Sequence, residues 1–190
     1  MNKRYHESPT GTSGEWRTPS YVFDAIGLTY GLDPCFPLSG VCYVPLERNA
    51  IVYTKLQNGL LQPWPRELLA FVNCPWVGRR SQVPWLQKFF RHGNGIAVCS
   101  ALTSADWFHQ LVWPNVQLAL FTDGKVKFVD PTGRVGEEPG FGTALLAVGN
   151  VAVQALRRSG LGACVIPDRT ARPSARSSIA PTLFEVGAAP

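Results

Sequence analysis

The chain has 190 residues, of which 45% are hydrophobic and 16% charged, and this composition excludes a disordered or fibrous protein. A chain of this length can bury one sizeable core, so we expect a single domain. The formal net charge of +5 permits contact with a polyanion without requiring it.

Both ends of the chain have compositions typical of flexible segments. Residues 1–14 are polar and rich in Gly, Ser and Thr, and residues 167–190 are basic and rich in Ser, Pro and Ala. The basic tail is either a solvated segment or a contact for phosphates. The folded domain is expected to span residues 15–166.

Short apolar runs alternate with helical patterns along that domain, which favours strands flanked by helices. Thr18 and Pro19 predict the start of a first helix, with the hydroxyl as cap, and Gly27 predicts its end. An irregular stretch is expected at 34–50. Strands are expected at 28–33, 68–72, 95–100, 116–121, 125–130 and 143–149, and later helices at 83–93, at 103–112 with Thr103 as cap, and at 151–160.

This order of elements predicts an α/β fold of the Rossmann-like kind, with an open mixed sheet of about six to seven strands. In such sheets, ligands bind beyond the carboxyl ends of the strands, where the strand order reverses. Three strand ends therefore become candidate sites. They are Asp33-Pro34-Cys35, Asn73-Cys74-Pro75-Trp76, and residues 100–103.

The tetrapeptide Asn73-Cys74-Pro75-Trp76 has the parts needed to hold an aromatic amine. The lone pair of such an amine is delocalised into its ring, so acceptors must draw the hydrogens before the nitrogen can attack. The side-chain carbonyl of Asn73 and the backbone carbonyl of Cys74 can be those acceptors. Pro75 stiffens the turn, and Trp76 can stack on a flipped base. The alternative is an ordinary strand-to-loop turn with a buried Trp.

Other templates are absent from the sequence. There is no phosphate-binding P-loop, complete GxGxxG, HExxH or nucleophile elbow. The five cysteines form no CxxC pair and their number is odd, so neither a disulfide framework nor a metal site is predicted. No apolar run is long enough for a membrane span, and no signal peptide is recognised, so we expect a soluble intracellular protein without a membrane partner.

Six short motifs in sequence resemble the phage-type DNA N6-adenine methyltransferases related to Dam. The order and approximate spacing agree from about residue 15 to about residue 150. The matching segments are Trp16-Arg17-Thr18-Pro19, Asp33-Pro34-Cys35, Asn58-Gly59-Leu60 with Trp64, Asn73-Cys74-Pro75-Trp76, Thr103 with Trp107-Phe108-His109, and residues 124–128.

The resemblance implies an S-adenosylmethionine-dependent methyltransferase domain whose partner is DNA, located in the cytoplasm of a bacterial host. The Asn73 side chain and the Cys74 backbone carbonyl would accept hydrogen bonds from the target amine. Trp76 would stack on the target base. His109 is not required as a base, because the proton can leave to water. The residues that would contact the cofactor are Trp16, Thr18, Pro19, Asp33, Pro34, Cys35 and Asn58. Core packing is the alternative role for Trp16 and Trp107.

Three departures separate this chain from the family pattern. Cys74 replaces the first proline of the catalytic motif, Asn58 replaces an acid, and no glycine-rich FxGxG loop follows the first strand, although Gly40 comes later. Two further functions therefore remain open: a DNA- or cofactor-binding protein with weakened or absent catalysis, and an N4-cytosine amino methyltransferase. Recognition of DNA would come from residues 77–94, from residues 129–142, or from the basic tail.

Overall fold

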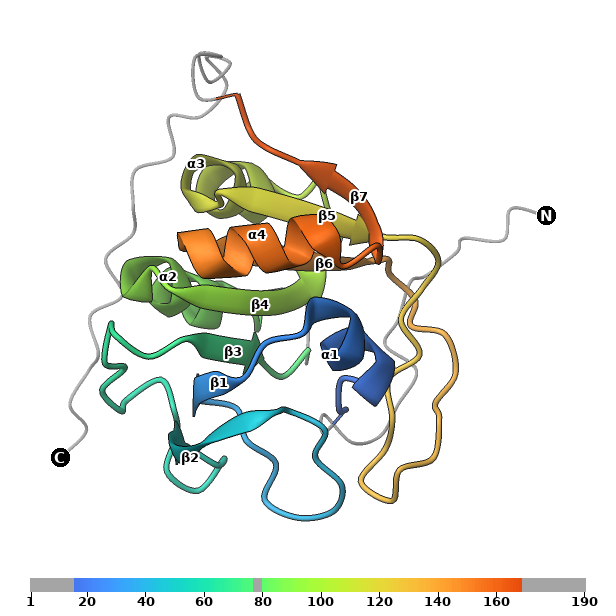
Figure 1. Cartoon of the computed structure of the whole chain (residues 1–190). Helices are drawn as coiled ribbons and strands as arrows, with labels where there is room; N and C mark the ends of the chain where they lie inside the picture. Colours follow the sequence, from blue (N-terminus) through green and yellow to red (C-terminus); the bar gives the residue numbers. More distant parts are fainter. Residues whose placement is uncertain (1–15, 77–79, 169–190) are drawn as a thin grey trace, which may run out of the picture.

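A seven-stranded mixed sheet forms the centre of the computed structural model, which describes residues 16–76 and 80–168 (Figure 1). The predicted tails lie outside these residues, except for Pro167 and Asp168. The strands are β1 (Tyr30–Asp33), β2 (Leu46–Val52), β3 (Ala70–Asn73), β4 (Gly95–Ser100), β5 (Leu118–Thr122), β6 (Thr143–Val148) and β7 (Gly162–Val165). The helices are α1 (Ser20–Ile26), α2 (Val83–His92), the π-helical turn η1 (Phe108–Val112), α3 (Trp113–Asn115) and α4 (Asn150–Arg158).

The strand order is β2-β1-β3-β4-β6-β5-β7, and the α/β sheet with flanking helices confirms the coarse fold prediction. Strands β2, β1, β3 and β4 are parallel, whereas β6 runs antiparallel to both β4 and β5. Because the chain leaves β1 for β2 on one side and continues in β3 on the other, the strand order reverses at β1. Crevices in open α/β sheets form at such a point.

Alternating side chains divide the core into two layers. Along β3, Ala70 and Val72 pack towards α2 and η1, whereas Phe71 packs towards α1 and α4. The same alternation along β4 and β6 gives every strand in the sheet centre two buried faces. Helix α4 crosses in front of the sheet in Figure 1, on the face that it shares with α1.

Several predicted elements agree closely with the structure. Helix α1 follows Pro19 and ends at Gly27, whose φ of 67° is the left-handed value that glycine favours. Strands β4 and β6 and helices α2 and α4 lie within one or two residues of their expected bounds. The capping role of Thr18 was wrong, because α1 has no side-chain cap hydrogen bond.

The expected irregular stretch at 34–50 was wrong at its end, where β2 begins at Leu46. This strand pairs only with β1, so its exposed side chains can be polar without a loss of burial. Strand β7 was not predicted; it is short and largely exposed at the other edge.

The expected strand at 125–130 was also wrong. Val129 forms only isolated bridges, to Arg17 and to Val135. Its neighbour Asp130 accepts from the backbone N–H groups of Thr132 and Arg134, and this turn ends the extended segment.

The helical segment predicted at 103–112 is displaced towards the C-terminus. Residues 103 and 104 form a turn, so the capping role of Thr103 was wrong, and the helix contains the π-helical turn η1. Pro114 lies two residues after η1 and has no N–H for a regular helical hydrogen bond, which accounts for an irregularity here. Among the described residues, no helix has the length and apolarity of a membrane span.

Candidate functional site

A cavity of about 400 Å³ lies at the carboxyl ends of β1 and β3, where the strand order reverses. This volume is within the usual range for small-molecule sites. Most residues that the sequence singled out contribute to its wall. They are Trp16, Thr18, Asp33, Pro34, Cys35, Asn58, Asn73 and Pro75.

The N-terminal segment, residues 16–19, crosses the strand ends and closes one side of this cavity. The Asn73 side-chain Nδ2 donates to the backbone carbonyl of Trp16 at 3.0 Å. Arg17 exchanges two backbone hydrogen bonds with Val129, of 2.9 and 3.0 Å. The segment is therefore held from β3 on one side and from the 123–142 loop on the other.

The hydrogen bond to Trp16 also fixes the orientation of the Asn73 carboxamide. Since Nδ2 is the donor, the opposite end of the group presents the Oδ1 acceptor. Side chains alternate along β3, so Asn73 lies on the same face as Phe71, and both line the cavity. Asn73 therefore lines the cavity with an acceptor that its bond to Trp16 does not use, and its role in binding an amine stays a prediction.

Cys74 and Trp76 are placed differently from Asn73 and Pro75, because neither lines the cavity. The Cys74 thiol points to the opposite face and is buried among α2 and η1 side chains. Burial raises its pKa to about 12, so it remains a neutral thiol near pH 7. Trp76 packs edge-to-face on Phe128, with ring centroids 5.2 Å apart, and its buried Nε1 has no hydrogen-bond partner.

Asp33 is a buried acid in the cavity wall. It is only 3% exposed, and its Oδ1 accepts from the backbone N–H of Cys35 at 2.9 Å. Desolvation by burial raises its pKa from 3.8 to about 7, although the Cys35 hydrogen bond acts in the opposite direction. The site can therefore exchange a proton, or gain a carboxylate charge, close to physiological pH.

The Asn58-Gly59 turn forms another part of the wall and packs tightly on the end of β1. Asn58 has a φ of 51°, a left-handed conformation that asparagine tolerates, and its Oδ1 accepts from Leu60 N–H. A Cβ atom on Gly59 would lie 2.1 Å from the carbonyl oxygen of Pro34. The backbone approach thus requires glycine here.

Two basic side chains hold the loops around the cavity, and neither of these roles was predicted. Lys88, on α2, donates to the carbonyls of Gly59, Leu60 and Gln62. Arg17 is buried and donates to the carbonyls of Ser39 at 2.7 Å and Val41 at 3.3 Å. Both bind backbone atoms far away in sequence, which no local motif reveals. Arg17 and Gly59 lie inside predicted motifs, but no role was predicted for them. The wall residues outside the predicted site are Phe36, Pro37, Leu38, Cys42, Val44, Thr54, Lys55, Phe71 and Trp85.

Thr18 has an unpartnered hydroxyl in the cavity wall. The residue is only 5% exposed, and its buried Oγ1 makes no hydrogen bond. A buried hydroxyl without a partner lowers the stability of a protein. The hydroxyls of Tyr30 and Thr143 are orphaned in the same way, but neither residue lines the cavity. Pro19 was also predicted to contact the cofactor, but it lines a neighbouring hollow and not this cavity.

Among the described residues, no group of three or more His, Cys, Asp and Glu side chains could hold a metal ion. Comparisons with protein-family models, curated proteins and solved structures find no match to this chain. Its function is therefore inferred from its own residues and geometry.

We predict that Thr18→Val stabilises the free protein. The substitution removes the orphaned hydroxyl with little change of shape, which corresponds to about 1 kcal/mol and a rise of about 2–4 °C in melting temperature for a domain of this size. Thermal denaturation followed by circular dichroism measures it. Thr143→Val is the matched variant and should raise the melting temperature similarly, because Thr143 Oγ1 is also buried without a partner, although it lies outside the cavity. A lower melting temperature for Thr18→Val would show that the hydroxyl is already bonded.

A second prediction concerns pH and Asp33. Since its folded pKa, about 7, exceeds its unfolded value of 3.8, the folded state binds the proton more tightly. The free energy of unfolding should therefore decrease as pH rises from about 4 to about 7, by roughly 1.4 kcal/mol for each pKa unit. Urea denaturation across this range should give a steeper decline for the wild type than for Asp33→Asn. Parallel profiles for the two proteins would contradict the shift.

Proposed function

We propose that the protein transfers a methyl group from S-adenosylmethionine to the N6 amino group of adenine in DNA. The observation that carries the proposal is the contact between Trp16 and Asn73, which are 57 residues apart, at the mouth of one cavity. The cofactor and amine-binding motifs of the resemblance thereby meet at the reversal point of the sheet. Chance matches of short motifs have no reason to converge in this way.

The cavity has features that fit the proposed cofactor. Its volume of about 400 Å³ suits a ligand of this size, and its wall combines aromatic surface with few polar groups. S-adenosylmethionine, when bound, supplies an electrophilic methyl group on a positively charged sulfonium. Thr18 Oγ1 offers a hydrogen bond, and the carboxylate form of Asp33 offers charge complementarity. Asn58 would contact the ligand from the rim.

Asn73 would act on the target amine as a hydrogen-bond acceptor. Its Oδ1 draws one amine hydrogen, and the Cys74 backbone carbonyl is suited to draw the second, which localises the lone pair on the nitrogen. The contribution of the protein is then positioning and exclusion of water, and the proton can leave to solvent afterwards. No strong base is needed at the cavity.

Trp76 would have to turn away from Phe128 to stack on a base. This movement is favoured by its buried Nε1, which has no hydrogen-bond partner in the observed position and would regain one in solvent. Stacking of a flipped base on the indole would replace the lost contact with Phe128.

The same position of Trp76 favours a second candidate function, a protein that binds the cofactor and DNA without methyl transfer. Cys74 in place of the motif proline points in the same direction, because the turn is then less rigid. Binding of S-adenosylmethionine by calorimetry, without transfer of label to DNA, would establish this second function and exclude the first.

We predict that incubation with labelled S-adenosylmethionine and DNA yields N6-methyladenine, and that Asn73→Ala lowers the rate at least about 100-fold through lost positioning. Base-resolved analysis of the product separates adenine from N4-methylated cytosine. Asn115→Ala is the matched control, because Asn115 is exposed and its Nδ2 likewise donates to one backbone carbonyl. Equal incorporation by wild type and Asn73→Ala would remove Asn73 from this role.

A further prediction uses the orphaned hydroxyls of Thr18 and Thr143. Thr18→Val should weaken S-adenosylmethionine binding about tenfold, as expected for one lost hydrogen bond, whereas Thr143→Val should not. Titration calorimetry on the two variants measures the difference. Equal affinities would mean that Thr18 Oγ1 is not a cofactor contact.

A further inference from the structure

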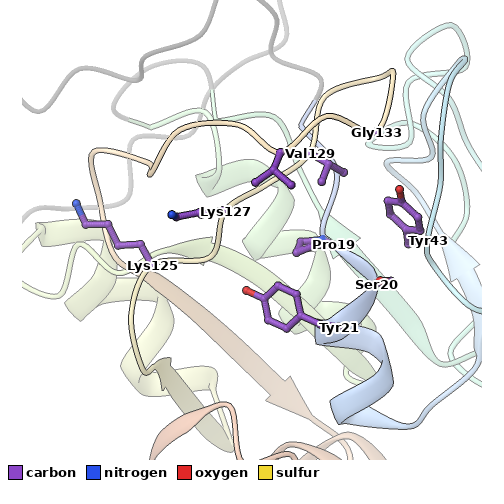
Figure 2. A pocket seen from close by; sticks show the side chains of 9 residues that line it. Pro19, Ser20, Tyr21, Tyr43, Lys125, Lys127, Val129 and Gly133 are labelled. Carbon is purple, nitrogen blue, oxygen red and sulfur yellow. The ribbon is translucent and has the colours of Figure 1, made fainter.

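A second hollow, of about 460 Å³, is lined by residues that neighbour the wall of the first cavity, and Figure 2 shows its side chains. Pro19 lines this hollow, whereas the preceding Thr18 lines the cavity. Val129 also lines it, and its backbone pairs with Arg17. We call it the Tyr-Lys groove. Its lining residues are Pro19, Ser20, Tyr21, Tyr43, Lys125, Lys127, Val129, Gly133 and Val135.

Two tyrosines and two lysines give the Tyr-Lys groove its chemical character. Tyr21 is 49% exposed and Tyr43 37% exposed, so both side chains are partly open to solvent. Figure 2 shows Lys125 and Lys127 at one end of the groove, Tyr43 at the other, and Tyr21 with Pro19 between them. Within residues 16–76 and 80–168, no acidic side chain lines the groove. It therefore combines stacking surfaces with positive charge.

Lys127 has a carboxylate neighbour, Glu138, at 3.8 Å. Both side chains are more than half exposed, and such a surface pair contributes little stability. Lys127 can therefore exchange this neighbour for a phosphate without a large loss. The groove remains complementary to a chain that carries negative charges beside flat rings.

We infer that the Tyr-Lys groove binds an unpaired stretch of DNA strand next to the base held at the cavity. This inference rests on the proposed function and adds how the substrate is presented. Stacking on Tyr21 or Tyr43 needs an exposed base face, which a paired duplex covers with neighbouring bases. Lysines beside aromatic rings are the usual combination for single-stranded nucleic acid. The groove also uses part of the 129–142 segment, which the sequence offered as one DNA contact.

The test measures binding of a fluorescent single-stranded DNA oligonucleotide, without cofactor, by anisotropy. Tyr21→Leu should weaken binding about tenfold, and Tyr21→Phe, which keeps the ring, should retain most of the affinity. Tyr21→Leu should leave binding of the matching duplex unchanged. These outcomes assign the loss to stacking on an unpaired base.

The lysines are tested through salt dependence. Lys125→Ala with Lys127→Ala should reduce the slope of log affinity against log salt concentration by about 1.4, because each phosphate contact to a single strand contributes about 0.7. Arg157→Ala with Arg158→Ala, on the exposed last turn of α4, removes the same charge elsewhere and should not change this slope. Circular dichroism verifies that all variants fold.

The inference fails if the wild type does not bind single-stranded DNA. It also fails if the tyrosine variants keep the affinity of the wild type, or if the lysine variants keep the salt dependence of the α4 control. Methyl transfer that is insensitive to these variants would overturn the groove and leave the proposed function standing. Groove-dependent binding of single strands by a protein that never methylates DNA would support the groove and reject the enzyme.

Discussion

The site depends on one hydrogen bond, from the Asn73 carboxamide to the backbone carbonyl of Trp16. It joins the end of β3 to a segment that precedes the sheet, and so converts two distant pieces of chain into facing walls. The same bond decides which end of the carboxamide can accept. Arg17 extends this effect, because its backbone pairs with Val129 and its guanidinium holds the carbonyls of Ser39 and Val41. Loops from three parts of the chain are thereby fixed around one cavity.

Strand alternation explains why neighbouring residues of one motif have different positions. Asn73 follows the face of Phe71 towards the cavity, whereas Cys74 follows Val72 into the core beneath α2. A substitution at residue 74 therefore changes packing and turn rigidity rather than the chemistry of the cavity wall. The thiol in place of the family proline is a structural departure, and its burial keeps it neutral.

Local sequence patterns predicted the central elements well because two-sided burial gives them strong signals. Strand β4, for example, is buried over its whole length, is apolar up to Cys99, and ends at the residue expected. Edge strands β2 and β7 have no such pattern, because one neighbour and an exposed face leave their composition free. The candidate site was predictable where it follows a strand end. Lys88 was not, because its role consists of hydrogen bonds to carbonyls 26 to 29 residues away.

The energetically unfavourable features of this part of the molecule are close together. Thr18 has an orphaned hydroxyl and Asp33 a desolvated carboxyl, and both line the same wall. Trp76, two residues after the strand end that supplies Asn73, has an orphaned indole N–H. Each lowers the stability of the free protein, and simple substitutions to apolar or neutral residues would remove the cost. Thr18 and Asp33 thus place two poorly solvated polar groups in the cavity wall, whereas the orphaned Trp76 Nε1 lies outside it.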